Sequence, residues 1–489
     1  MEHTSSTRLR PGMTITGRVE AVALDGRGMF TVDGRRAYVL GALPGDLADV
    51  RIRRRRRGEL HCEAVVVHEE GIPRRQPACV HVSECGGCRW QQWAIDDQRR
   101  LKREIVEHAL AEGLPGAHVA VLPTLAVGPE YGYRNKMEFT FGSVPVRHSE
   151  RGAGTTLGLH RAGRFDVTFD LTRCWLPSPR ASEVVAWVRA WANRHGLPAY
   201  DSRTHEGLLR HLVVRESAAT GEMMVSLVAM SRGVDGLDEL ATDLPAAMPQ
   251  VASVLLGVNT RVGDTAIPEE LALLAGRQTI LERIASPAHG SRGIEVEISL
   301  RSFLQTNSFG AARLYDLVAT QAELSGAERV LDLYCGAGLI GLWLAPSARE
   351  VVGLELVPEA VEDAERLRRR LDLEHVRFVA GVAEEVLPRW AEAGDTFDVI
   401  VADPPRAGMH PKAVAALIEL APARVVYVSC NPRALAADMK ELIAAGYVAG
   451  PVQPADMFPQ TAHVESVVRL DRRRLDRRRL GATSLGSTE

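Results

Sequence analysis

The sequence predicts an α/β protein built from three folded parts, and three observations support this fold class. The chain has 489 residues, more than one hydrophobic core usually organises, so several domains are expected. Short apolar strands alternate with Gly-rich or charged turns near the N-terminus, whereas strands alternate with helices near the C-terminus. We therefore expect a small OB-like β-barrel, an α+β middle domain and a doubly wound, Rossmann-like C-terminal domain.

The first part, residues 9–68, is the predicted β-barrel. Residues 1–58 contain twelve arginines and six acidic residues, and the run Arg53–Arg57 concentrates this positive charge. Basic barrel surfaces are typical of proteins that bind single-stranded nucleic acid, but charged strand edges also serve simply to prevent aggregation. The residues alone leave both interpretations open.

The second part, residues 69–300, is the predicted α+β middle domain. A cysteine-rich loop opens it, and a helix over residues 94–113 follows, because apolar positions recur there at helical spacing. Strand-like stretches such as 133–142 and 208–216 surround a second expected helix near 182–196.

Three of the seven cysteines, Cys79, Cys85 and Cys88, crowd into the opening loop, which the Gly86-Gly87 pair allows to fold tightly. In a reducing compartment such a set favours metal ligation over disulfides. A fourth thiolate must come from elsewhere in the chain, and Cys174 is our candidate, with Cys62 the less suitable one. Zinc and an iron-sulfur cluster both accept four thiolates.

The third part, residues 301–470, is the predicted doubly wound domain, whose ligands bind at the carboxyl ends of the strands. A buried strand ends here in the turn Tyr334-Cys335-Gly336-Ala337-Gly338, and glycines in such a turn let the backbone approach a nucleotide-like ligand. Glu355 ends the next strand at a spacing suited to an acid that holds a ribose diol. Gly341 extends the turn to a GxGxxG spacing, so a dinucleotide-dependent dehydrogenase is the alternative at this point.

Two later strand ends argue against hydride transfer. Asp403-Pro404-Pro405-Arg406 closes one strand and Ser429-Cys430-Asn431-Pro432 closes the next, both at the edge where a substrate would lie. A dehydrogenase has no evident use for either motif. A cysteine in a turn-forming Asn-Pro context suits an active thiol better than a structural one, which more often lies within the apolar strand.

The chemistry that needs such a thiol is methylation of carbon-5 of uracil, which is a poor nucleophile until a thiolate adds to carbon-6. A base must then remove the carbon-5 proton so that the thiol can leave. Glu465 is our choice, because it lies just before the apolar stretch VVRL, from which only Ser466 separates it, near a strand end, and partial desolvation would raise the pKa of its carboxyl. His463 competes, and strand alternation would place both side chains on one face.

With these motifs in order, the chain resembles the RNA uracil-5-methyltransferase family, which includes tRNA and 23S ribosomal RNA enzymes. The resemblance covers nearly the whole length and rests on the motifs FLQTN, LDLYCGAG, GLEL, DPPRAG, VSCNP and DMFPQTAHVES. It implies that S-adenosyl-L-methionine is the methyl donor, and the residues that it places against cofactor or uracil are Gln305, Tyr334, Glu355 and Asp403. It also implies that Cys430 is the nucleophile and Glu465 the base. The departure is Leu339, where some members carry an Asn that touches the cofactor.

The resemblance adds expectations about the first two parts of the chain. It implies that the barrel is a TRAM domain that binds RNA, so that Arg53–Arg57 meet phosphates. It implies a 4Fe-4S cluster on Cys79, Cys85, Cys88 and Cys174, with zinc as the alternative. Because the cluster and the barrel occur together, 23S rRNA is favoured over tRNA. Phe303 is either a base-packing aromatic or a core residue.

Other enzyme and binding classes stay as alternatives. An amino-group methyltransferase would use Asp403-Pro404-Pro405 without a nucleophilic cysteine, and a non-catalytic RNA-binding protein could retain the fold. No run of about 18 apolar residues and no signal-peptide core occur, so we expect a cytoplasmic protein without a membrane segment. We expect a monomer, and we expect the Arg-rich residues 471–489 to form a disordered tail.

Overall fold

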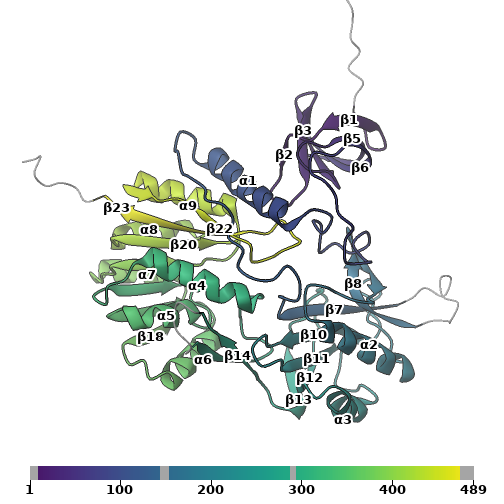
Figure 1. Cartoon of the computed structure of the whole chain (residues 1–489). Coiled ribbons are helices and arrows are strands. Elements are labelled where there is room, and N and C mark those ends of the chain that lie inside the picture. The colour runs from purple at the N-terminus through teal and green to yellow at the C-terminus, as the bar shows by residue number, and fades with distance from the viewer. Residues whose placement is uncertain (1–8, 144–153, 287–292, 474–489) are drawn as a thin grey trace, which may run out of the picture. The chain divides into compact units, whose positions relative to one another are not determined.

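The computed structural model describes residues 9–143, 154–286 and 293–473. The chain divides into two compact units, one made of residues 1–107, 123–316 and 454–465, the other of residues 108–122, 317–453 and 466–489. Three sheets of six, seven and eight strands give the α/β class that the sequence predicts (Figure 1). None of the described helices has the length and apolar character needed to cross a bilayer.

A six-stranded sheet at the start of the first unit covers the residues, 9–68, for which a small barrel is expected. Its strands occur in the order β1-β5-β6-β4-β3-β2. Their apolar side chains enclose a separate core that includes Phe30, Val50 and Leu60. The strands are β1 Thr14–Arg18, β2 Ala21–Val22, β3 Gly28–Val32, β4 Arg35–Leu40, β5 Leu47–Arg56 and β6 Glu59–Glu69.

A seven-stranded sheet with two helices forms the rest of the first unit's architecture, in the order β13-β12-β11-β10-β7-β8-β9. Strands β10 and β11 are buried along nearly their whole length; β11 (MMVSLVA) is almost entirely apolar, whereas β10 (LRHLVVRE) also buries polar side chains such as Arg210 and Arg215. The strands are β7 Lys136–Ser143, β8 Thr155–Arg161, β9 Arg164–Asp170, β10 Leu209–Glu216, β11 Met223–Ala229, β12 Val251–Val258 and β13 Glu270–Gly276. The helices are α2 Pro179–Arg194 and α3 Leu237–Ala247, and a hairpin of β14 Ile280–Ile284 and β15 Ile294–Ile298 follows.

Two helices are shared by the units in sequence. Helix α1 (Ile95–Gly113) begins in the first unit and ends in the second, and so does α4 (Ser308–Ala322). The helix expected over residues 94–113 is therefore present. The predicted domain boundaries at 69, 301 and 471 stay predictions, although β23 (Glu465–Arg472) continues past the last of them. Residues 474–489 of the expected tail lie outside the described residues.

The second unit contains most of the eight-stranded sheet, of which seven strands follow the order β18-β17-β16-β19-β20-β23-β21. Strands β16 to β20 pair in parallel, and β23 joins β20 in antiparallel orientation. The strands are β16 Arg329–Leu333, β17 Glu350–Glu355, β18 Val376–Ala380, β19 Val399–Ala402, β20 Arg424–Ser429 and β21 Tyr447–Ala449. The helices are α5 Leu339–Leu344, α6 Pro358–Arg370, α7 Ala383–Glu392, α8 Pro411–Leu420 and α9 Pro432–Ala444, with a short 3-10 turn η3 Ala345–Ser347.

This strand order contains a topological switch point. From β16 the chain adds β17 and β18 on one side, then returns to place β19 and β20 on the other. In open α/β sheets ligands bind at the carboxyl ends of the strands beside such a reversal. Tyr334 follows β16, Glu355 ends β17, Asp403 follows β19 and Cys430 follows β20, so the topology brings the predicted residues to one edge.

Candidate functional site

The turn after β16 has an unusual backbone that fixes its shape. Tyr334, Gly336 and Gly338 all have positive φ, at 65°, 53° and 76°. The N–H groups of Tyr334 and Cys335 donate to the carbonyl of Leu354 at 2.9 and 3.1 Å, which ties the turn to β17. A non-glycine residue such as Tyr334 adopts this region at an energetic cost, and such strain concentrates at functional sites.

The requirement for glycine at position 338 comes from packing inside the protein. A Cβ on Gly338 would lie 2.4 Å from the ring of Phe378 and 3.0 Å from the Cβ of Ala364. From the sequence, the glycines of this turn are expected to let a ligand approach the backbone closely. At Gly338 the structure supplies a different reason, the contact with Phe378, and the role of the residue in binding the cofactor stays a prediction.

The carboxylate of Glu355 is held in place by the turn that it faces. One oxygen accepts the N–H of Gly336 at 3.0 Å and the other accepts the N–H of Val357 at 2.9 Å. Each carboxylate oxygen has a second lone pair, so the bidentate acceptance of a ribose diol remains possible in this orientation.

Asp332 lies in the motif LDLYCGAG but was not among the residues predicted to act at the site. It is fully buried, and its Oδ2 accepts the N–H of Gly341 at 2.7 Å, while Oδ1 has no hydrogen-bond partner among the described residues. Burial raises the pKa of this carboxyl to about 7, and the neighbouring Asp403 and Glu355 add to the effect. A buried polar atom without a partner is uncommon, and together with the raised pKa it makes Asp332 a candidate functional group beside the turn.

Asp403 and Cys430 follow neighbouring strands, and Asn431 connects their loops. The Asn431 side chain donates to the carbonyl of Arg406 at 2.8 Å and accepts the N–H of Arg433 at 3.2 Å, so it also caps α9. Burial raises the pKa of Asp403 to about 6. Asn431 therefore bridges the two loops, which was not predicted from the sequence, although its place directly before Pro432 is the signal of a helix N-cap.

The position of Cys430 relative to the sheet follows from strand register. In the antiparallel pair of β20 and β23, Ser429 lies opposite Ser466. Cys430 is the residue after the first of these serines, and Glu465 is the residue before the second. The Cys430 side chain is half-buried, which leaves part of it accessible.

The first unit contains the remaining catalytic and cofactor candidates. Glu465 is 5% exposed and begins β23, whereas His463 precedes the strand and is exposed. Alternation along a strand would have placed Glu465 and His463 on the same face. The structure instead buries Glu465 and exposes His463. Gln305 is half-buried, and Phe303 is 64% exposed, so the interpretation of Phe303 as a packed core residue is wrong.

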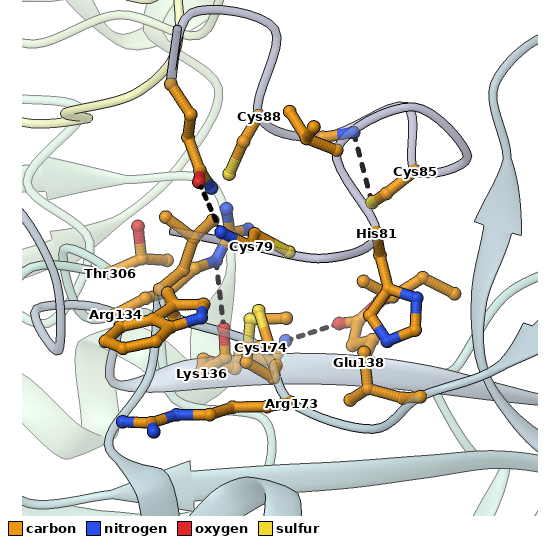
Figure 2. Close-up of a pocket in the computed structure, with 18 residues that line it drawn as sticks. Cys79, His81, Cys85, Cys88, Arg134, Lys136, Glu138, Arg173, Cys174 and Thr306 are labelled. Carbon is orange, nitrogen blue, oxygen red and sulfur yellow. Dashed lines mark hydrogen bonds and ion pairs between the residues drawn. The ribbon is translucent and has the colours of Figure 1, made fainter. Parts of the chain in front are cut away.

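A pocket of about 410 Å³ in the first unit is lined by all four predicted metal ligands. Figure 2 shows Cys79, Cys85 and Cys88 on the loop and Cys174 on the chain across the pocket from them. All four are free thiols, and burial raises the pKa of Cys88 to about 12 and that of Cys174 to about 11. Cys62 instead lies in the core of the barrel, away from this pocket's lining.

The donor set suits a metal, but the arrangement of the side chains is not that of a metal site. Within the described part of the chain, no group of three or more His, Cys, Asp or Glu side chains is placed to hold an ion. Four thiols around one pocket are the ligands that zinc and iron-sulfur clusters prefer. The structure therefore brings the predicted ligands together without showing the predicted cluster.

The arginines of the barrel lie mostly in solvent. Arg54, Arg55 and Arg56 are exposed on β5, and Arg57 is exposed in the turn after it. Arg53 is exposed and pairs with Glu63 at 2.5 Å. Exposed arginines along one strand are available to phosphates, so the predicted RNA contact remains open to test.

Comparisons with known proteins agree on one family. A family model described as tRNA (uracil-5-)-methyltransferase matches residues 288–473. A protein named as an uncharacterized RNA methyltransferase of Caldanaerobacter subterraneus is 34% identical over 467 residues, which cover 94% of this chain and 99% of that protein. Another so named, from Porphyromonas gingivalis, is 35% identical over 465 residues, covering 92% and 98%.

The comparison of structures gives the same result. The crystal structure of Pyrococcus abyssi tRNA (uracil-54, C5)-methyltransferase in complex with S-adenosyl-L-homocysteine is similar to this chain, with a TM-score of 0.70 and 25% sequence identity. The match covers 93% of this chain and all of that one.

Proposed function

Because this chain belongs to the RNA uracil-5-methyltransferase family, we propose that it methylates carbon-5 of a uridine in RNA, with Cys430 as covalent nucleophile and Glu465 as base. Membership makes it an S-adenosyl-L-methionine-dependent RNA methyltransferase. The observation that carries the finer proposal is that Cys430 follows β20 at the same sheet edge as the glycine turn, Glu355 and Asp403.

The chemistry assigns one role to each residue. The Cys430 thiolate adds to carbon-6, which forms the S–C6 bond and moves the ring electrons into an enolate centred on carbon-5. S-adenosyl-L-methionine supplies an electrophilic methyl group to that carbon. Glu465 then takes the carbon-5 proton, the C5=C6 double bond re-forms and the thiolate leaves.

The cofactor contacts are proposed on the geometry of the second unit and on one residue of the first. Gly336, Gly338 and Tyr334 form the turn on which the cofactor rests, and Glu355 accepts its ribose hydroxyls. Asp403 and Gln305 contact the cofactor or the uracil. Support comes from the positive-φ turn and from the two backbone N–H groups that orient the Glu355 carboxylate.

The substrate is proposed to be 23S rRNA, because the thiol pocket and the basic barrel occur in one chain. The second candidate is tRNA, which the matching family model and the P. abyssi enzyme both carry in their names. We propose that the barrel is a TRAM module and that its arginines meet the phosphates of either RNA.

The test uses methyl-labelled donor with unmodified transcripts of 23S rRNA and of tRNA, followed by nuclease digestion and identification of the labelled nucleoside. We expect 5-methyluridine from the 23S transcript. Label only in tRNA would identify tRNA, the second candidate, as the substrate. Label on an exocyclic amine would show an amino-group methyltransferase, and no label on either RNA would rule out both candidate substrates.

We propose further that Cys79, Cys85, Cys88 and Cys174 hold a 4Fe-4S cluster, with zinc as the alternative. The support is that four free thiols line one pocket of about 410 Å³. The test is anaerobic purification followed by iron, sulfide and zinc analysis. Iron with equimolar sulfide is expected, whereas stoichiometric zinc without sulfide would contradict the assignment.

A further inference from the structure

The segment that leads into Glu465 is irregular but deeply buried. It follows β22 (Gln453–Ala455), contains no helix or strand up to residue 464, and belongs to the first unit. Asp456, Met457 and Gln460 are each no more than 1% exposed. Buried backbone outside regular structure must find hydrogen-bond partners elsewhere, so the source of those partners is informative.

Four consecutive carbonyls of this segment accept hydrogen bonds from outside it, all within the first unit. The donors come from distant parts of the sequence, so residues 457–460 are held from several sides. The pairs are Asn307 Nδ2 to Met457 at 2.9 Å, Lys102 Nζ to Phe458 at 2.9 Å, Tyr133 Oη to Pro459 at 3.0 Å, and the Trp90 N–H to Gln460 at 3.2 Å.

Lys102, on α1, is the charged donor among these four, and burying a charged group costs more free energy than burying a neutral one. Its side chain is fully buried, and its ammonium group also pairs with Asp456, whose side chain is 1% exposed. Burial lowers the pKa of Lys102, and the Asp456 carboxylate opposes this effect. A buried ion pair is often no more stabilising than apolar side chains of similar volume, but separating its members leaves a buried charge uncompensated and is strongly destabilising.

Gln98 lies one helical turn before Lys102 and holds the middle of the segment at Gln460. Its side chain accepts the N–H of Gln460 at 2.8 Å and donates to the Gln460 side chain at 2.9 Å. It also donates to the carbonyls of Trp90 and Trp93. Gln460 has a φ of 71°, a conformation that costs free energy in a non-glycine residue and that these bonds maintain.

We infer that Gln98 and Lys102 form one face of α1 whose purpose is to position the base, by fixing the segment that carries Glu465 into β23. This inference rests on the proposed function and deepens it. The base acts only after methyl transfer, when it removes the carbon-5 proton and frees Cys430. A displaced Glu465 therefore slows resolution of the covalent protein–RNA adduct and leaves its formation unchanged.

The test is single-turnover reaction with the transcript that the wild type methylates. The rate at which the covalent adduct appears and the rate at which it disappears are both read from denaturing gels. The main variant is Lys102→Met with Asp456→Leu, which replaces the buried ion pair by apolar groups, while Arg99, 3.6 Å from Asp456, keeps its ion pair with Asp96. Gln98→Met is a second, smaller variant that keeps the ion pair. Arg103→Met is the matched control, because Arg103 lies on the same helix but pairs with Glu107 in solvent.

We expect adduct formation at the wild-type rate in all variants. We expect adduct resolution to slow by about 10- to 100-fold in the main variant and to slow in Gln98→Met, with no change in Arg103→Met. Urea denaturation checks that the main variant folds, and if it does not, Gln98→Met decides. A wild-type adduct that all variants resolve at the normal rate would overturn the inference alone. Methylation of ordinary RNA by the wild type, without any adduct on RNA that contains 5-fluorouridine, would overturn the covalent mechanism and this inference with it.

Discussion

Replacing Gly338 by alanine tests whether the cofactor turn is shaped by internal packing. The new Cβ would lie 2.4 Å from Phe378 Cζ and 3.0 Å from the Cβ of Ala364, at a backbone φ of 76°. The left-handed backbone costs about 1 kcal/mol for a residue with a Cβ. The clash with a buried ring adds about 1–3 kcal/mol, so the free energy of unfolding should fall by about 2–4 kcal/mol.

A matched glycine separates the two contributions. Gly394 has a φ of 77° and open space around the position of a Cβ, so Gly394→Ala should lose only the backbone cost of about 1 kcal/mol. Urea denaturation without methyl donor, followed by far-UV circular dichroism, measures both variants. Adding Phe378→Leu to Gly338→Ala should recover part of the loss. Equal destabilisation by the two alanines would refute the packing explanation of Gly338.

Three further predictions follow from the same structure. The pKa of Asp332 is raised to about 7, so this group favours folding below its unfolded pKa near 4 and loses that contribution as pH rises through 7. Asp332→Asn should therefore remove up to about 4 kcal/mol of the fall in the free energy of unfolding between pH 4 and 8, measured by urea denaturation. An unchanged pH dependence in the variant would contradict this. Replacing both Arg54 and Arg55 by alanine should weaken RNA binding and reduce the slope of log affinity against log salt concentration by about 2. Filter binding at several salt concentrations measures this slope. An unchanged slope would show that these side chains contact no phosphates. Asn431→Ala removes a helix cap and the hydrogen bond to the Arg406 carbonyl, so the free energy of unfolding should fall by about 1–2 kcal/mol. Adduct formation, measured in single turnover, should also slow. Normal adduct kinetics would show that the hydrogen bond to Arg406 only stabilises the fold.

The strands that carry the candidate site could be predicted because each is a short apolar run closed by a turn signal. The strands ending near Tyr334, Glu355, Asp403 and Cys430 all have glycine, proline or asparagine within a few residues of their ends. Parallel pairing then brings their carboxyl ends to one edge. The sequence therefore predicted both the fold class and the set of residues at that edge.

The features that the sequence did not predict depend on contacts between distant residues. Lys102 and Asp456 are 354 positions apart, and the amphipathic pattern of α1 gives no sign that a lysine on it is buried. The reason for glycine at position 338 likewise depends on Phe378, forty residues along the chain. Strands β12 to β15 were not singled out, since their apolar runs lack the motifs that marked the later strands.

The most direct test of the central claim is the reaction with RNA that contains 5-fluorouridine in place of uridine. Fluorine at carbon-5 cannot leave as a proton, so the methylated base stays attached to the thiol. We predict a stable protein–RNA adduct that carries one transferred methyl group and maps to Cys430, and no adduct with Cys430→Ala. Methylation of ordinary RNA by the wild type, without any adduct on the fluorinated RNA, would contradict the mechanism proposed here.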